Sequence, residues 1–405
     1  MSLPLEGIKV VEMALAVLSP HTGAHLSDMG ADIIKVEHPA GGDMARSLTA
    51  VRQVSASMKP GMMNFMFELE NRGKKSVTAD LTFPEGIEIV HKLIEKSDIF
   101  LTNYQLDVLT KLKVDYETLS KLNPKLIYAI ATGWGFKGPD KDKPAFDFVA
   151  FARSGIMGTM GEPDSAPPAC LPAFGDHITA MTLAYGIILA LYHRERTGEG
   201  QFVHTSLLGG LTEAASLNLQ VCLSTGQDIP KVSRKSAGNP MWNFYETKDK
   251  RWLQLAMLQT DRHWHDFCEA LEIQHLENDP KFDTHDKRRD NTLELIPILD
   301  EVFAKRTYAE WEERFTDKNI IRGLVTTFLE QTKDPQLWEN GQLVKFNHPA
   351  QGPIDMVGMP VYLSKSPGQI RGPAPELGQN TEEVLLELGY SWEDIAGLKD
   401  NKVIL

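Results

Sequence analysis

Short β-rich runs and helix-like segments alternate along the first 130 residues, and this alternation constrains the fold more than any other feature of the chain. The β-rich runs are Ile8–Glu12, Asp32–Glu37, Ser76–Leu81, Asp98–Thr102 and Lys125–Ile130. Helix-like segments at residues 20–29 and 84–96 lie between them. Strands separated by helices form βαβ units, which place the strands parallel in one sheet. We therefore predict an α/β fold with a mostly parallel sheet, whose ligand binds beyond the carboxyl ends of the strands.

The rest of the chain differs in style from this alternating segment. Residues 133–175 are rich in loops, and a later pair of β-rich runs flanks Lys248-Asp249-Lys250 and predicts a hairpin. The other predicted elements are helices near 146–153, 177–196, 205–225, 261–315 and 381–388 and a strand at 357–363. A length of 405 residues suits two domains. We predict a large α/β domain from residues 1–225 and 331–405 and a smaller α+β domain from residues 226–330.

Composition restricts the compartment and the partners. Three widely spaced cysteines, Cys170, Cys222 and Cys268, suit neither a disulfide framework nor a zinc knuckle, which fits a reducing cytosol. The N-terminus lacks the basic and apolar segments of a signal peptide, so a cytoplasmic location is expected. The longest apolar run, 178–192, falls short of about 18 residues and predicts a core helix and no membrane partner. A net charge of −13 argues against nucleic acid as a partner.

Asp176 is the candidate for covalent chemistry. It follows a stretch of small residues and prolines and precedes the apolar run 178–192, which predicts a loop that ends where a buried helix opens. An aspartate at that place is a favoured N-cap, and its charge suits the positive end of the helix. The same surroundings hold a carboxylate oriented and short of water, as a covalent nucleophile requires. The local pattern leaves both roles open.

Two other segments are candidates for ligand binding. Asn71–Ser76 is a compact basic turn before a strand, which is either a solvated turn or a clamp for phosphate oxygens. Asn103 and Tyr104 end a strand, where a sheet of this class places its ligand. Lys111 follows two helical turns later.

Several common catalytic patterns are absent from the sequence. His21 and His25 are spaced four apart, as two ligands on one helix face would be, but no HExxH pattern surrounds them, and we predict no metal. The chain has neither a GxxxxGK[ST] phosphate loop nor a GxSxG elbow. ATP-driven ligation and ordinary serine hydrolysis are therefore disfavoured, and no nucleotide cofactor is expected.

Several blocks in a fixed order make the chain resemble the family III CoA-transferases, a group that includes formyl-CoA, carnitine, bile-acid and 2-hydroxy-acid CoA-transferases. The blocks are Pro4–Val10, Gly30–Glu37, Gly73–Val77, Asn123–Tyr128, Gly133–Gly135, Arg196–Gln201 and Leu377–Leu385. The resemblance implies a Rossmann-like large domain from both chain ends, a smaller middle domain, and a homodimer of two interlocked rings. It also implies that coenzyme A enters as an acyl-CoA substrate and that the second substrate is a carboxylic acid.

The resemblance assigns roles to individual residues. Asp176 matches the nucleophilic aspartate of the family. The positions that match or adjoin contacts to coenzyme A are His38, Lys74, Asn103, Tyr104, Lys111 and Lys143. His38 stands where arginine is frequent, and Lys143 adjoins Pro144, where some members have lysine. Gly238 and Asn239 correspond to a glycine-rich loop that covers the site in formyl-CoA transferase, although only one glycine is present here.

The implied reaction is an acyl-CoA:carboxylate exchange through an aspartyl anhydride and an aspartyl-CoA thioester. One alternative is an α-methylacyl-CoA racemase or epimerase, which shares the fold and needs a base on each face of the α-carbon. Racemases of the family have a histidine where Phe146 stands here, which favours the transferase. A non-catalytic acyl-CoA-binding protein is the second alternative.

The identity of the acid is constrained only weakly by the sequence. Val17 and Leu18 stand where the oxalate-handling enzyme has polar or small residues, which favours a bulkier and less polar acid. An apolar patch is either part of an acyl pocket or plain core packing; it consists of Met62, Met63, Phe65, Met66 and Phe67.

Overall fold

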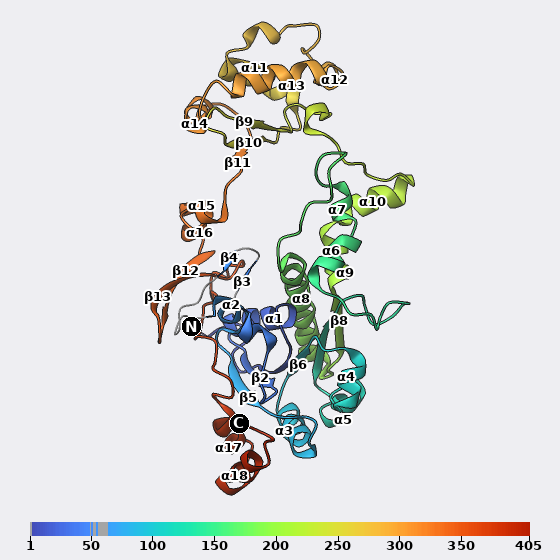
Figure 1. The fold of residues 1–405 in the computed structure, drawn as a ribbon, viewed down its shortest axis with the longest axis vertical. Coiled ribbons are helices and arrows are strands. Elements are labelled where there is room, and N and C mark those ends of the chain that lie inside the picture. The colour runs from blue at the N-terminus through green and yellow to red at the C-terminus, as the bar shows by residue number, and fades with distance from the viewer. Residues whose placement is uncertain (1, 49, 52–53, 56–63) are drawn as a thin grey trace. The chain divides into compact units, whose positions relative to one another are not determined.

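A six-stranded parallel sheet is the largest sheet in the described part of the structure, a computed structural model that describes residues 2–48, 50–51, 54–55 and 64–405 (Figure 1). The strands lie in the order β5-β2-β1-β6-β7-β8 and each neighbouring pair is parallel. Their bounds are β1 (Lys9–Met13), β2 (Asp32–Glu37), β5 (Lys75–Thr78), β6 (Ile99–Thr102), β7 (Ile127–Thr132) and β8 (Phe202–Ser206). The predicted α/β fold with a mostly parallel sheet is confirmed.

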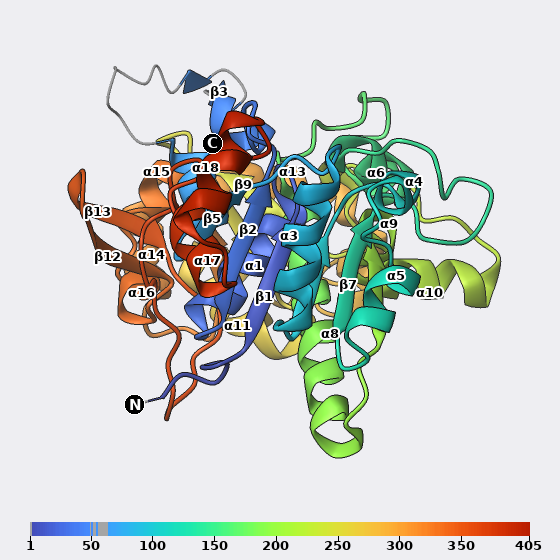
Figure 2. The same cartoon turned by 90° about the horizontal axis from the view of Figure 1, so that it is seen from below.

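Helices cover both faces of this sheet. One face packs against α1 (Leu18–Asp28), α6 (Asp147–Arg153), α8 (Phe174–Thr197) and α9 (Leu207–Ala214). The other face, seen in front in Figure 2, packs against α3 (Pro84–Glu95), α5 (Tyr116–Leu122), α17 (Thr381–Glu387) and α18 (Trp392–Asp400). Consecutive strand residues enter opposite cores: Val10 belongs to the first and Val11 to the second. Burial on both faces explains why β6 and β7 are almost continuously apolar.

The direction of strand addition reverses at the centre of the sheet. From β1 the chain adds β2 and β5 on one side, then returns to β6, β7 and β8 on the other. β1 and β6 are therefore neighbours, and Met13 pairs with Thr102 at their carboxyl ends. The loops that leave these two strands diverge, and such a switch point is where open α/β sheets bind ligands.

Contacts along the chain define two compact units. Unit 1 comprises residues 1–157, 169–226 and 335–405, and unit 2 comprises residues 158–168 and 227–334. The sequence had placed residues 158–168 with the large domain, whereas their contacts are with unit 2. In unit 1 the C-terminal α17 packs on β5, so both chain ends contribute to the same core (Figure 1).

Unit 1 also contains shorter elements. They are α2 (Phe65–Asn71), α4 (Leu106–Lys111), α10 (Ser216–Thr225), α16 (Pro335–Glu339), the 3-10 helix Met44–Ser47 and the pairs β3 (Ala50–Val51) with β4 (Val54–Ser55) and β12 (Leu343–His348) with β13 (Gly352–Val357); α7 (Ile156–Thr159) spans the boundary of the units. The strand predicted at 357–363 is wrong, because β13 ends at Val357. Pro360 lacks the N–H that would continue a ladder.

Unit 2 is built on a three-stranded antiparallel sheet with the order β11-β10-β9. Its strands are β9 (Phe244–Glu246), β10 (Trp252–Leu255) and β11 (Arg322–Leu324). Its helices are α11 (Thr260–Leu271), α12 (His285–Asp290), α13 (Thr292–Phe303), α14 (Tyr308–Phe315), α15 (Phe328–Gln331) and the 3-10 turns Arg234–Ser236 and Gln274–Leu276. The hairpin predicted around Lys248-Asp249-Lys250 is present as β9 and β10.

The long helix α8 differs from its prediction at both ends. It begins at Phe174, after Ala173 in a left-handed conformation with φ 62°, so Asp176 lies in the first turn and is not the N-cap. The helix is also longer than the apolar run that predicted it: its 24 residues make it the one described helix that is long and apolar enough to cross a membrane. A core helix passes the same test, and α8 contributes Leu183 and Ile187 to the core.

A buried charge network joins three parts of unit 1. The carboxylate of Glu12 on β1 accepts hydrogen bonds from Lys35 Nζ at 3.0 Å and from Lys74 Nζ at 2.8 Å. All three side chains have no exposed surface. Lys35 also pairs with Asp43 at 2.9 Å. Buried charges are tolerated when they are paired in this way, and removing one partner leaves the other uncompensated.

Gly23 on α1 is required by this network. A methyl group at Gly23 would overlap Glu12 Oε2 and would lie 3.1 Å from Lys74 Nζ. Because two ammonium groups hold the Glu12 carboxylate in place, it cannot move aside freely. The absence of a side chain at Gly23 therefore lets α1 pack directly against the network.

We expect Gly23→Ala to lower the free energy of unfolding by about 2–4 kcal/mol, since it displaces a paired buried carboxylate. Chemical denaturation measures this change. Gly397→Ala is the matched control, because Gly397 is also helical and no atom lies within 4 Å of its added methyl group. Equal stability of the two variants would contradict the steric argument.

Candidate active site

A cavity of about 510 Å³ lies at the switch point of the parallel sheet. It contains Asp176, and most of its other lining residues come from the end of β7, from the loops after β1, β6 and β7, and from the starts of α1, α6 and α9. They are Leu15, Ala16, Val17, Leu18, Met44, Asn103, Tyr104, Gln105, Val108, Ala131, Thr132, Gly133, Pro144, Ala145, Phe146, Asp147 and Leu207. The carboxyl ends of neighbouring parallel strands thus meet a carboxylate from α8, as the sequence had predicted for a ligand site.

Asp176 is mostly buried at this cavity. Burial raises the pKa of its carboxyl group to about 7, and the neighbouring carboxylate of Asp147 acts in the same direction. His177 partly opposes the shift. A carboxylate with a raised pKa is a stronger nucleophile once ionised, because it is less well solvated than one in water.

Asp147 fixes the start of the helix that carries Asp176. It lies at the first position of α6, and its Oδ1 accepts a hydrogen bond from Gly175 N–H at 2.9 Å. The N-terminal cap of α8 therefore comes from a residue 28 positions earlier in the chain. Asp176 does not have to cap the helix. The backbone N–H groups that could have bound an oxyanion at the start of α8 are directed at Asp147 instead. Burial raises the pKa of Asp147 as well.

Asn103 joins the two loops that diverge at the switch point. Its Oδ1 accepts a hydrogen bond from Leu15 N–H at 2.9 Å, and its Nδ2 donates to Leu15 O at 2.8 Å. Tyr104 lines the cavity beside it, and burial raises the pKa of the Tyr104 phenol. Asn103 thus shapes the cavity wall with both ends of its amide.

The buried charge network reaches the cavity through the loop after β1. Ala16 has a left-handed conformation with φ 63°, and its N–H donates to Asp43 Oδ1 at 2.9 Å. Asp43 is held in turn by Lys35. The loop that presents Val17 and Leu18 to the cavity is therefore anchored on buried charges.

Three predicted contacts to coenzyme A lie outside this cavity on exposed surface. His38 approaches Asp80 at 3.4 Å, Lys111 pairs with Asp107 at 2.9 Å, and Lys143 pairs with Asp140 at 2.6 Å. Exposed pairs of this kind are weak and are readily exchanged for another anion.

Lys74 is placed differently from its prediction. Its Nζ is fully buried and has four acceptors within 3.0 Å: both oxygens of Glu12, Pro20 O and Asn71 Oδ1. Burial, together with the competing charge of Lys35, lowers the pKa of Lys74 to about 8. An ammonium group has three protons, so no donor remains for a phosphate.

The predicted lid residues lie in unit 2. Gly238 and Asn239 line a separate cavity of about 700 Å³ within that unit. The Asn239 side chain accepts from Met241 N–H at 2.9 Å and donates to Met257 O at 2.9 Å. This amide gives the segment a fixed local turn.

The predicted apolar patch is only partly described. Phe67 is buried, with the Arg46 guanidinium 4.0 Å from its ring centre, so it packs in the interior. Phe65 is exposed, and Met62 and Met63 lie outside the described residues.

Sequence reasoning missed three charged groups near Asp176. Asp147 was considered only as the neighbour of Phe146, although an acidic residue that opens a helix in a loop-rich segment is a usable signal. Glu70 and His177 meet across more than 100 residues of sequence. No local pattern predicts such a contact.

The family assignment follows from comparison with known sequences. The model of CoA-transferase family III matches residues 5–381. The chain belongs to CoA-transferase family III. The predicted resemblance is confirmed, and the protein is an enzyme that transfers coenzyme A between an acyl-CoA and a carboxylic acid.

Characterised family members are similar along nearly the whole chain. (R)-2-hydroxy-4-methylpentanoate CoA-transferase from Clostridioides difficile is 33% identical over 404 residues, which cover 99% of both chains. Cinnamoyl-CoA:phenyllactate CoA-transferase from Clostridium sporogenes is 32% identical, with 98% of this chain and 97% of that one covered. Succinate–glutarate CoA-transferase from Agrobacterium fabrum is 33% identical, with 95% and 96% covered.

Solved structures of the family have the same fold. A CAIB/BAIF family protein from Brucella suis is 28% identical with a TM-score of 0.83, and the match covers 96% of this chain and all of that one. A protein from Mycobacterium tuberculosis in an orthorhombic crystal form is 26% identical with a TM-score of 0.82, and the match covers 94% and 99%.

The cavity agrees with the transferase assignment over the racemase alternative. Phe146, which stands where a racemase of the family has histidine, is 68% exposed and lines the cavity. A phenyl ring cannot accept a proton from an α-carbon.

The raised pKa of Asp176 predicts a stability effect that needs no activity assay. In the folded protein Asp176 ionises near pH 7, whereas in the unfolded chain it ionises near its ordinary value of 3.8. Raising the pH across this window therefore destabilises the folded state. We expect Asp176→Asn to raise the free energy of unfolding by about 1–3 kcal/mol at pH 8 and by much less at pH 4.

Denaturation at the two pH values measures the difference. Asp317→Asn is the control, because Asp317 is exposed and far less of its charge is shielded from water. If Asp176→Asn raises the free energy of unfolding at pH 8 no more than Asp317→Asn does, then ionised Asp176 does not destabilise the folded protein.

Proposed function

We propose that Asp176 carries the acyl group and then coenzyme A during transfer. Its carboxylate attacks the thioester carbonyl of the donor acyl-CoA, the C–S bond breaks, and a mixed anhydride and CoA thiolate result. The thiolate attacks the aspartyl carbonyl of the anhydride and releases the donor acid as its carboxylate. An aspartyl-CoA thioester remains on Asp176.

The second half of the cycle repeats these steps with the acceptor. The acceptor carboxylate attacks the aspartyl thioester and releases CoA thiolate, which then attacks the acceptor carbonyl of the new anhydride. The new acyl-CoA leaves and the carboxylate of Asp176 is restored. No proton is transferred in any step, and the free energy of the thioester bond is conserved. The cycle therefore requires neither a metal ion nor ATP.

The position of Asp176 in the cavity is the observation that supports this cycle most strongly. It lies mostly buried where the loops of three parallel strands meet. Partial burial limits access of water, which would hydrolyse both covalent intermediates. Among the predicted ligand residues, Asn103 and Tyr104 line the same cavity.

Coenzyme A is proposed to enter with its phosphates on the exposed surface. His38, Lys111 and Lys143 are the predicted residues whose basic side chains are accessible there, and each has a single exposed or partly exposed carboxylate partner. Lys74 is not included, since its ammonium group is saturated by buried acceptors.

We propose that the exchanged acid has a bulky apolar side chain. Among the described residues that line the cavity, the charged ones are Asp147 and Asp176, and both are acidic. A second carboxylate of the substrate would therefore find no cation there, whereas Val17, Leu18 and Met44 offer apolar contact. The names of two relatives, which act on 2-hydroxy-4-methylpentanoate and phenyllactate, agree with this class.

The protein is further proposed to be a cytoplasmic homodimer without a membrane partner. Large apolar side chains are exposed along α8 and α10; they are Met181, Tyr185, Ile188, Leu189, Tyr192, Leu217, Leu219, Val221 and Leu223. A monomer seldom exposes so many adjacent apolar groups, and a second copy of the chain would cover them. Three widely spaced cysteines, too few for a disulfide framework, support a reducing compartment. Sedimentation analysis measures the mass in solution.

Chemical trapping tests the covalent cycle. We expect the enzyme incubated with acyl-CoA and then hydroxylamine to carry a hydroxamate on Asp176, and borohydride to reduce the aspartyl thioester at the same residue. Peptide mass spectrometry identifies the modified side chain. Asp176→Ala is expected to lose about 10³-fold or more of the transfer rate.

An unmodified Asp176, or near-normal transfer by Asp176→Ala, would contradict the covalent cycle. Absence of exchange by the unaltered enzyme with any acid would instead favour a protein that only binds acyl-CoA. Deuterium uptake at the α-carbon without exchange of acids would favour the racemase.

A panel of acids tests the proposed specificity. With acetyl-CoA as donor, we expect kcat/KM for 2-hydroxy-4-methylpentanoate or phenyllactate to exceed that for succinate or glutarate by about 10-fold or more, because a buried unpaired carboxylate is costly. Mass spectrometry of the new CoA thioesters measures the products. A preference for the dicarboxylates would contradict the argument from the cavity charges.

A further inference from the structure

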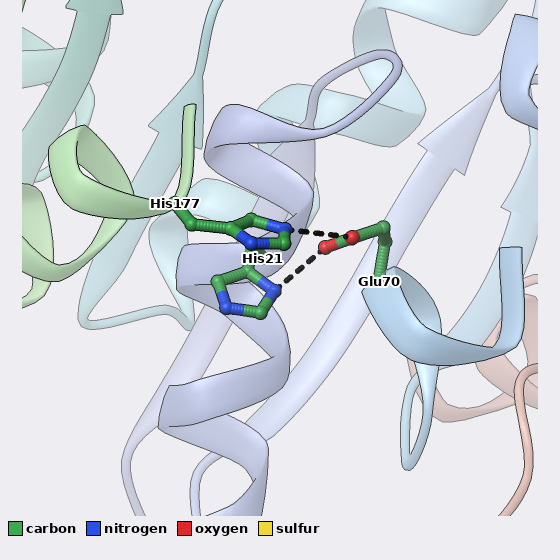
Figure 3. A group of neighbouring side chains, drawn as sticks. All are labelled: His21, Glu70 and His177. Atoms are coloured by element: carbon green, nitrogen blue, oxygen red, sulfur yellow. Dashed lines mark hydrogen bonds and ion pairs between the residues drawn. The ribbon is translucent and has the colours of Figure 1, made fainter. Parts of the chain in front are cut away.

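A carboxylate and two imidazoles meet next to the nucleophile (Figure 3). Glu70 on α2 accepts a hydrogen bond from His21 Nδ1 on α1 at 2.7 Å and from His177 Nε2 on α8 at 3.2 Å. His177 directly follows Asp176 in the first turn of α8. Three helices from distant parts of the sequence thus place their side chains at one point beside Asp176.

Packing holds this cluster in one arrangement. The ring centres of His21 and His177 lie 4.1 Å apart with the rings stacked, and the ring centre of His25 lies 4.3 Å from that of His21. The Glu70 side chain is 4% exposed and that of His177 is 38% exposed. Glu70 is therefore a fixed anchor, and His177 is the member with more exposed surface.

Glu70 is the anion of this cluster, and its hydrogen bond favours the charged form of His177. Burial disfavours ionisation of Glu70, but the hydrogen bonds from His177 and His21 outweigh it and lower its pKa to about 2. Burial lowers the pKa of His21, and that of His25 to about 3, so burial favours the neutral form of both rings. For His177 the hydrogen bond to Glu70 outweighs burial and raises the pKa.

The groups that face Asp176 differ in sign. Asp147 from α6 and Glu70 from α2 are both acidic, and each disfavours a negative charge on Asp176. His177 is the one neighbour in the described part of the chain whose charge favours it. His177 itself is faced by Glu70, Asp176 and Asp147 and by the ring of His21.

We propose that Glu70 and His177 form a positioning pair, which fixes an imidazolium beside Asp176 and so favours the carboxylate form of the nucleophile near neutral pH. The proposal rests on the function assigned to Asp176 above and adds two residues to it. Glu70 acts through His177: its hydrogen bond orients the ring and stabilises its positive charge, while His21 supports the ring by stacking.

The same three side chains could in principle hold a divalent cation, since two imidazoles and a carboxylate are common ligands. His21 Nδ1 and His177 Nε2 are already at hydrogen-bond distance from the Glu70 carboxylate. A cation would have to replace the proton on His177, and the charge-pair interpretation needs no additional group. Metal binding is therefore an outcome that the experiment must distinguish.

Replacing His177 tests the proposal. His177→Asn removes the charge and keeps an N–H that can donate to Glu70, so the acidic limb of the pH profile of kcat/KM should move up by about 1 unit, with an approximately 10-fold loss near pH 6.5 and recovery near pH 9. His177→Lys restores a cation and should keep the limb close to its original position. An unchanged limb in His177→Asn, or equal losses in both variants at every pH, would overturn the proposal.

A second measurement separates this proposal from the covalent cycle. Carbodiimide labels the protonated form of a carboxyl group, so labelling of Asp176, followed by peptide mass spectrometry, should persist to a pH about 1 unit higher in His177→Asn. This shift is expected even if Asp176 proves not to be acylated. If His177→Asn does not fold, His177→Gln takes its place in both measurements.

Control experiments test the role of Glu70 and the presence of a bound metal ion. Glu70→Gln removes a negative charge near Asp176 together with the support of His177, so its shift should be smaller than that of His177→Asn. Glu277→Gln is the matched control, because Glu277 also accepts from a histidine, His265, at 2.8 Å but belongs to unit 2 and lies on the surface; no shift is expected. A bound metal ion in elemental analysis, with activity lost after chelation, would overturn the charge-pair interpretation.

Discussion

The carboxylate of Glu12 accepts hydrogen bonds from the buried ammonium groups of Lys35 and Lys74, and the position of the active-site cavity depends on this interaction. Lys35 comes from the adjacent strand β2 and Lys74 from the turn before β5, so the network ties together three segments of unit 1. Asp43 extends it to the loop after β1. Because unpaired buried charges are costly, these partners fix one another's places. The loop after β1, which lines the cavity, is held in place by these ion pairs.

A second long-range contact sets the chemistry of the nucleophile. Asp147 caps α8 through Gly175 N–H, which frees Asp176 in the first turn to face the cavity. The same carboxylate raises the pKa of Asp176. The proposed imidazolium of His177 counters that effect. The reactivity of Asp176 is therefore a balance among groups from α2, α6 and α8, in a partly buried place where each charge is strongly felt.

Sequence reasoning succeeded where a role is decided by neighbours in the chain. The strands and helices of the parallel sheet follow from local apolar periodicity, and the end of a strand correctly predicted that Asn103 lies at the carboxyl edge of the sheet. It failed where a role depends on distant partners. Lys74 looked like a phosphate contact in a basic turn, but Glu12 and Asn71 take up its ammonium group. Asp176 looked like an N-cap, but Asp147 provides the cap.

By itself the sequence determined the α/β class, the family and the candidacy of Asp176. These follow from short-range patterns and from blocks of sequence in a fixed order, which survive without knowledge of any contact. Only the tertiary structure decided which charges surround Asp176, and that Lys74 is buried whereas Lys111 and Lys143 are exposed. Glu70 and His177 are more than 100 residues apart in sequence, and their contact exists only because α2 and α8 pack against the same helix, α1. Burial and charge pairing are properties of that packing, and no local pattern encodes them.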